Sequence, residues 1–128
     1  MARVRRPHDW LRQAELDLAA ARDLSATAHY EWACFLCQQA AEKGVKALHE
    51  SQGIEAWGHA IVGLLAGVEE VPDEVLDAGR VLDRHYIPTR YPNTHPAGAP
   101  GDMYTARDAE QALGDAETVL DHVQRRIP

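Results

Sequence analysis

The feature that most constrains the fold is a helical stripe of small side chains between residues 30 and 52. One face of this segment carries, in steps of three and one, Ala33, Leu36, Cys37, Ala40, Ala41, Gly44, Val45 and Leu48. This spacing is typical of one side of an α-helix. Because most of the side chains are small, a neighbouring helix can approach closely. The segment predicts a helix over 30–52 that ends at Gly53.

Two weaker helical segments flank the long one. A first helix is expected after Asp9, which could cap it, and it ends in the break at Ser25–His29. A short helix is expected around Ile61–Val68, where two glycines weaken it. This short helix therefore depends on tertiary packing.

Two more helices are predicted in the second half of the chain. Pro72 and Asp73 open one of them, and Pro88 stops it. Thr105 and Asp108 form a capping-box-like start to the last helix. Its apolar residues step by three and four without a break: Ala106, Ala109, Leu113, Ala116, Leu120, Val123 and Ile127. Such a stripe suits a helical bundle or the seam of a homodimer.

Length and composition favour one all-α domain over residues 1–128. Apolar residues make up 45% of the chain and aromatic residues only 6%, a mixture that favours closely packed helices over a β-sandwich. No segment alternates for long in the manner of a strand. The expected architecture is an up-and-down bundle of four main helices plus one short helix.

The charge balance limits the partners. The net charge of −7 repels nucleic acid, so any binding of a nucleotide or RNA phosphate must come from a local basic patch. Neither DNA nor a membrane is an expected partner. No secretory or membrane-spanning segment is evident, which favours the cytoplasm. Residues 1–7, with Arg3, Arg5 and Arg6, are expected to form a flexible basic tail.

A loop rich in proline is the candidate functional segment. Residues 88–104 form a loop longer than the roughly 12–15 residues usual in a compact domain, and such loops are often functional. It contains Arg90 and His95. A guanidinium binds phosphate in a bidentate fork, and a histidine can move protons near neutral pH. The alternative is a surface loop in which the arginine caps helix carbonyls and the histidine is solvated.

Two arginines on the preceding helix add positive charge. Arg80 and Arg84 are four residues apart and share a face that leads towards Arg90. Asp77 and Asp83 lie nearby in sequence, so a solvated face of ion pairs is the competing interpretation.

Other chemistries find little support. Cys34 and Cys37 lack the second pair of a structural zinc site, and only Cys37 falls on the apolar stripe, so packing cysteines are expected. His49-Glu50 lacks the second histidine of a zinc protease, because Gly53 stands in its place. There is no phosphate-binding P-loop and no dinucleotide fingerprint. No metal and no cofactor are expected.

Several segments together resemble the HEPN family (higher eukaryote and prokaryote nucleotide-binding). Glu15–Ala21 is similar to its first-helix signature, and Gln38–Leu48 is similar to its second. His59 with the leucines that follow resembles the start of its third helix. Arg90–Asn93 reads R-Y-P-N, which resembles the R-Y-P-[DN] loop of one large subgroup, and Tyr104 with the alanine-rich last helix completes the likeness.

The resemblance implies an all-α bundle, commonly a homodimer. It also implies a partner, since many bacterial members are encoded beside a minimal nucleotidyltransferase that they bind. Some members are metal-independent endoribonucleases or toxins with an R-x4–6-H motif, which Arg90 and His95 fit. Tyr91 stands where active members have a polar residue, and Ala97 stands where toxins carry a tyrosine.

These observations leave three hypotheses. The first is a nucleotide-binding module that partners a nucleotidyltransferase in a toxin–antitoxin-like system, with phosphate bound by Arg80, Arg84, Arg90, Tyr91 and Asn93. The second is an endoribonuclease with Arg90 and His95 as catalytic residues. The third is a purely structural module for helical dimerisation.

Overall fold

The computed structural model describes residues 4–128, and within that range the regular elements are all helical. In chain order they are α1 (Pro7–Ala26), α2 (Tyr30–Gln52), α3 (Ile61–Leu65), α4 (Asp73–Asp83), the 3-10 helix η1 (Pro92–Thr94), α5 (Pro100–Met103) and α6 (Ala106–Arg126). The all-α bundle expected from the sequence is confirmed, with α1, α2, α4 and α6 as its four main helices.

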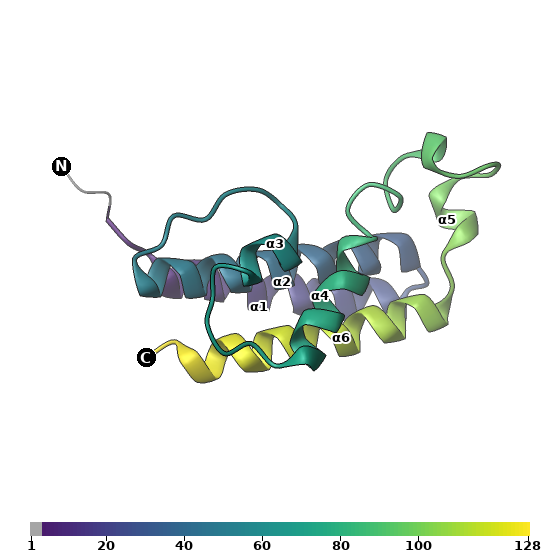
Figure 1. The fold of residues 1–128 in the computed structure, drawn as a ribbon. Coiled ribbons are helices and arrows are strands. Elements are labelled where there is room, and N and C mark those ends of the chain that lie inside the picture. The colour runs from purple at the N-terminus through teal and green to yellow at the C-terminus, as the bar shows by residue number, and fades with distance from the viewer. Residues whose placement is uncertain (1–3) are drawn as a thin grey trace.

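The long helices lie side by side and the proline-rich loop projects from one end of the bundle. Helices α1 and α2 run antiparallel and share the most extensive interface, followed by α2 with α6 and α4 with α6. Figure 1 shows the start of α1 and the end of α6 at one end of the bundle, while α5 and the loop before it lie towards the other end. Helix α3 lies above α2 and is reached by an extended segment after Gly53.

Helix α2 lies at the centre of the core. Fully buried residues on it include Ala33, Ala40, Ala41, Val45, Ala47 and Leu48. The stripe of α6 faces this helix and α4: Ala109, Ala116, Leu120 and Val123 are buried within the single chain. The seam that the sequence suggested for a homodimer is therefore largely used inside one chain, so a dimer contact needs another surface.

The helix boundaries were predicted best where a capping residue marks the end of the helix. Helix α2 has the expected bounds, and Gly53 closes it in a left-handed conformation with φ of 72°. Thr105 caps α6 with Asp108 as the reciprocal partner. Helix α1 instead begins at Pro7 without a side-chain cap, and Asp9 lies in its first turn.

The segment from α4 to α6 is more structured than a plain loop. Helix α4 ends at Asp83, before the expected stop at Pro88, and turns follow it. Two single-turn helices, η1 and α5, begin at Pro92 and Pro100. Proline fits the first position of a helix, where its missing N–H is not needed. Two prolines of this segment thus begin short helices.

Both cysteines are packed in the core, which corrects the expectation that only Cys37 faces the apolar side. Cys34 and Cys37 are free and fully buried. Burial raises the pKa of the Cys34 thiol to about 12 and raises the pKa of the Cys37 thiol as well. Both thiols are therefore neutral near pH 7, which suits a packing role.

The basic N-terminal segment makes contacts with the bundle where the structure describes it. The Arg5 guanidinium donates to the carbonyl oxygens of Gly53 at 3.1 Å and Ile54 at 3.2 Å, and lies 3.7 Å from the Glu50 carboxylate. Arg6 pairs with Asp9 at 2.7 Å. Arg3 lies outside the described residues. Arg5 thus closes the C-terminal end of α2 with a side chain from the segment before α1.

Gly44 is required for the close approach of α6 to α2. A Cβ at this position would overlap the Leu120 side chain. We expect Gly44→Ala to lower the free energy of unfolding by about 1–3 kcal/mol, because overpacking outweighs the better helix propensity of alanine. Gly114→Ala is the matched control: it lies in α6 with open space around it, and should stabilise by about 0.5–1 kcal/mol. Urea unfolding measures both, and equal changes in the two variants would contradict the packing account.

Burial of His85 predicts a pH-dependent stability. Burial lowers the pKa of His85, and burial with Arg126 and Arg125 nearby lowers that of His122. Near pH 6 these two histidines therefore bind more protons in the unfolded chain than in the folded chain, so their contribution to the free energy of unfolding falls on acidification. We expect His85→Leu to flatten this dependence between pH 7 and 5, as followed by urea unfolding. His8→Leu, at an exposed position, should leave the slope unchanged; an unaltered slope in His85→Leu would contradict the assignment.

Candidate functional site

Arg90 lies in the loop after α4, where aromatic rings hold its guanidinium. The guanidinium carbon lies 4.5 Å from the ring centre of Phe35, 4.7 Å from that of Tyr86 and 5.3 Å from that of Tyr91. All three distances are within the range of cation–π attraction. The Nε–H donates to the Tyr86 carbonyl oxygen at 2.8 Å. The side chain is therefore fixed in orientation by groups that carry no negative charge.

The positive charge of Arg90 has no carboxylate partner among residues 4–128. Its one hydrogen bond uses Nε, so the two terminal nitrogens remain available, although the residue is partly buried. An arginine held in this way commonly binds a planar or tetrahedral oxyanion. The geometry therefore favours an anion site at Arg90.

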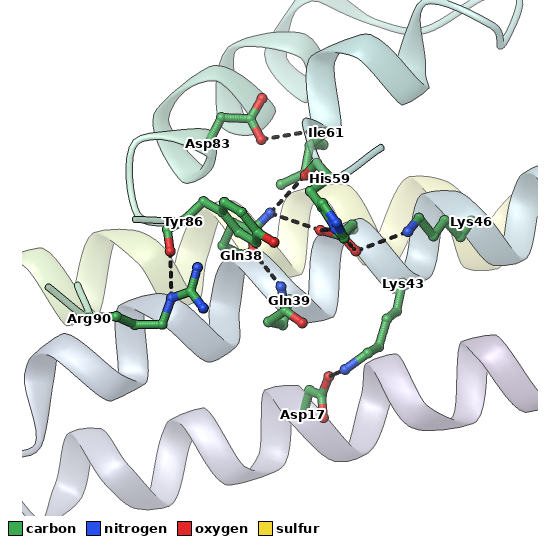
Figure 2. A network of polar contacts seen from close by, with 11 residues as sticks. Asp17, Gln38, Gln39, Lys43, Lys46, His59, Ile61, Asp83, Tyr86 and Arg90 are labelled. Carbon is green, nitrogen blue, oxygen red and sulfur yellow. Dashed lines mark hydrogen bonds and ion pairs between the residues drawn. The ribbon is translucent and has the colours of Figure 1, made fainter. Parts of the chain in front are cut away.

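Tyr86 joins Arg90 to a polar network on α2. The Tyr86 ring stacks on the His59 ring at 5.1 Å between centres, with the planes 16° apart. Figure 2 shows Tyr86 between Arg90 and His59, above α2. His59 Nδ1 lies 3.3 Å from a carboxylate oxygen of Glu42. Arg90, Tyr86 and His59 thus form one continuous polar and aromatic surface.

Glu42 is the hub of this network. Its carboxylate is buried, and it accepts from Lys46 at 3.2 Å and from Gln38 at 3.3 Å in addition to its contact with His59. The Gln38 amide also donates to the His59 carbonyl oxygen at 3.0 Å. A buried carboxylate is costly unless it is paired in this way. The pairing holds the segment that carries His59 against α2.

Asp83 and Lys43 extend the network in two directions. The Asp83 carboxylate accepts from the backbone N–H groups of Ile61 at 2.7 Å and Val62 at 3.1 Å, which ties the end of α4 to the start of α3. Burial raises the pKa of Asp83. Lys43 pairs with Asp17 on α1 (Figure 2). The loop that carries Arg90 thus follows a helix whose end is fixed to the rest of the bundle.

His95 has a defined place in the same loop, with one ring nitrogen already used. Its Nε2 donates to the Pro88 carbonyl oxygen at 2.6 Å, and its ring meets the Tyr104 ring edge-on at 6.2 Å. Only Nδ1 is left for proton transfer. Burial raises the pKa of Tyr104 to about 12, so its hydroxyl is neutral near pH 7. In the part of the chain that the structure describes, no interaction links His95 to Arg90.

The other predicted phosphate ligands differ in their surroundings. Tyr91 lies against Arg90, as described above. Arg80 pairs with Asp77 at 2.6 Å on the exposed side of α4, which is the arrangement of the competing interpretation. Arg84 is exposed at the end of α4, and Asn93 is exposed in η1. The structure therefore brings Tyr91 to Arg90 by direct contact, whereas Arg80 is already engaged.

Five residues around Arg90 or in the Glu42 network were not predicted as site residues: Phe35, Gln38, Glu42, His59 and Tyr86. Glu42 is buried and pairs with the half-buried Lys46. Gln38 lies beside the small-residue stripe and is fully buried. A glutamine and a glutamate four residues apart indicate a polar network only if both are known to be buried. Their burial depends on α3 and the 54–60 segment, which are distant in sequence, so the sequence of α2 does not reveal it.

Neither a metal-binding cluster nor a membrane-spanning helix occurs in the described part of the chain. Residues 4–128 contain no group of three or more His, Cys, Asp or Glu side chains placed to hold a metal ion. Among the described helices, none is both long and apolar enough to cross a membrane.

Comparison with known proteins finds one family across the chain. The model of the HEPN domain matches residues 7–126. A protein of Methanocaldococcus jannaschii named "Putative toxin MJ1304" is 31% identical over 127 residues, which cover 90% of this chain and 84% of that protein.

Solved structures share the fold. The crystal structure of TT1696 from Thermus thermophilus is 44% identical, with a TM-score of 0.94 over 96% of this chain and 99% of that chain. The archaeal HEPN homologue ST0689 is 42% identical, with a TM-score of 0.86 over 98% of this chain and 100% of that chain. A HEPN domain protein from Thermotoga maritima is 32% identical, with a TM-score of 0.74 over 92% and 96% of the two chains. The chain described here therefore belongs to the HEPN domain family.

Proposed function

We propose that this HEPN domain binds the phosphate of a nucleotide or of RNA at Arg90. The observation that carries the proposal is a partly buried guanidinium held by three aromatic rings and one backbone carbonyl, with no carboxylate partner in the described residues. Its free terminal nitrogens match two phosphate oxygens. Tyr91, whose ring is exposed beside Arg90, offers a face on which a base can stack.

The proposal includes a protein partner. Similarity to a protein named as a toxin supports a role in a toxin–antitoxin-like pair, and a minimal nucleotidyltransferase is the partner that we propose. Co-expression with a nucleotidyltransferase encoded by the neighbouring gene should yield a complex that survives gel filtration. Separate elution of the two proteins would contradict this part of the proposal.

Arg90 is tested by substitutions that separate charge from shape. We expect Arg90→Ala to weaken ATP binding about ten- to a hundredfold, since a charge-assisted bidentate contact is lost. Arg90→Lys keeps the charge but removes the fork and the stacking on the rings, so it should recover only part of the affinity. Isothermal titration calorimetry measures each affinity.

Arg12→Ala is the control, because Arg12 is exposed on α1 outside this surface. Equal affinity of Arg90→Ala and Arg12→Ala would contradict phosphate binding at Arg90. Absence of ATP binding by the wild type, together with absence of RNA binding, would contradict the proposal as a whole.

A metal-independent endoribonuclease is the second candidate function. It is favoured by the four residues between Arg90 and His95, and by the free Nδ1 of His95 beside its bonded Nε2. In this mechanism Arg90 would hold the scissile phosphate, and His95 would move a proton to or from a ribose oxygen.

This second function predicts RNA cleavage that persists in EDTA and is lost in His95→Ala. Cleavage products of a labelled single-stranded RNA on a denaturing gel provide the measurement, with His8→Ala as the matched control at an exposed position. Unchanged cleavage in His95→Ala, or none in the wild type, would exclude His95 as a catalyst.

A further inference from the structure

A second pocket lies away from the Arg90 loop, at the end of the bundle where α1 begins and α2 ends. Its volume is about 230 Å³, and it is lined by Trp10, Lys46, Glu50, Glu55, Ala56 and Trp57. None of these residues belongs to the 88–104 loop. The first turn of α1 forms one side, the last turns of α2 form the floor, and the extended segment after Gly53 forms the other side. The pocket is therefore a separate site from the proposed phosphate site.

The charged groups at the floor of this pocket, Glu50 and Lys46, are each paired within the protein. Glu50 is only 4% exposed, and Arg5 approaches it while also bonding the carbonyl oxygens of Gly53 and Ile54. Lys46 pairs with the buried Glu42 at 3.2 Å. Arg5 therefore links the segment before α1 to the start of the extended segment, and this contact supports the shape of the pocket.

Two indole rings form the apolar part of the lining. Trp57 is 80% exposed, which leaves a large ring almost wholly in water at the rim of a cavity. The Trp10 ring is already in cation–π contact with Lys46, whose Nζ lies 5.8 Å from the ring centre. Indole is the aromatic ring that attracts cations most strongly. Because Lys46 already lies against Trp10, Trp57 is the indole that remains to attract a ligand combining apolar surface with positive charge.

The charges around the pocket leave one carboxylate without compensation. Lys46 offsets Glu42, and Arg5 offsets Glu50. Glu55 is exposed and has no ion pair or hydrogen bond among the residues that the structure describes. The net charge of the chain is −7, which adds a long-range attraction for cations. An anionic ligand would instead be repelled by Glu55 and by the net negative charge of the chain.

We propose that this pocket binds a small alkylguanidinium compound. A planar guanidinium can lie flat against the Trp57 indole and donate two parallel hydrogen bonds to the Glu55 carboxylate, while its alkyl chain packs towards Trp10. A pocket of about 230 Å³ is smaller than the roughly 300–1,000 Å³ of sites for drug-sized ligands, so the ligand is short. Nothing in this assignment depends on phosphate binding at Arg90.

The test uses n-butylguanidinium as the probe and N-butylurea as an uncharged compound of similar shape. Indole N–H signals in a ¹⁵N-correlated NMR spectrum report each tryptophan separately. We expect n-butylguanidinium to shift the Trp10 and Trp57 signals in a saturable way and to leave Trp32, on the N-terminal part of α2, unmoved. N-butylurea should bind at least about tenfold more weakly, because it lacks the charge.

Glu55→Gln should weaken n-butylguanidinium binding about tenfold and bring it close to the affinity for N-butylurea. Glu110→Gln removes the same charge from an exposed position on α6 and should have no effect. Equal affinity for the two compounds, or equal loss in the two variants, would overturn the proposal, as would the absence of any saturable shift. Tighter binding of the peptide Gly-Arg-Gly than of n-butylguanidinium would overturn the assignment to a free small molecule.

Discussion

Helix α2 is buried along most of its length, and this burial requires its buried polar side chains to find partners within the protein. On one side its alanines and Gly44 allow α6 to pack closely. On another side Gln38 and Glu42 are buried and must find partners within the protein. Those partners come from α2 itself and from the segment that carries His59. The packing of one helix therefore organises the polar surface above it.

That polar surface explains why Arg90 is left without a counter-charge. The buried carboxylate of Glu42 is already paired with Lys46 and contacts His59, and Asp83 is bonded to the start of α3. The rings of Phe35 and Tyr86 hold the guanidinium in place of a carboxylate. A fixed cation with free donors is suited to bind an oxyanion from solution. The candidate site thus lies where the neighbouring carboxylates are already paired with other groups.

The sequence predicted features that depend on local signals and missed those that depend on distant contacts. The bounds of α2 and the cap at Thr105 were predicted because Gly53 and Asp108 act within one helical turn. Arg90 was proposed as a phosphate ligand from its residue type and its loop. The contact of its guanidinium with Phe35 was not predicted, because Phe35 lies far away in sequence. The burial of Glu42 was not predicted, because burial by the 54–60 segment leaves no periodic pattern.

The central claim is that the Arg90 guanidinium is an anion site, and the arginine Nε–H signals of the protein in a ¹⁵N-correlated NMR spectrum test it most directly. The bond from Nε to the Tyr86 carbonyl oxygen should make the Arg90 signal visible at neutral pH. Titration with ATP is predicted to shift this signal in a saturable way while the signal of Arg12 stays in place. A spectrum in which the Arg90 signal does not move, or moves only together with those of exposed arginines, would contradict the account.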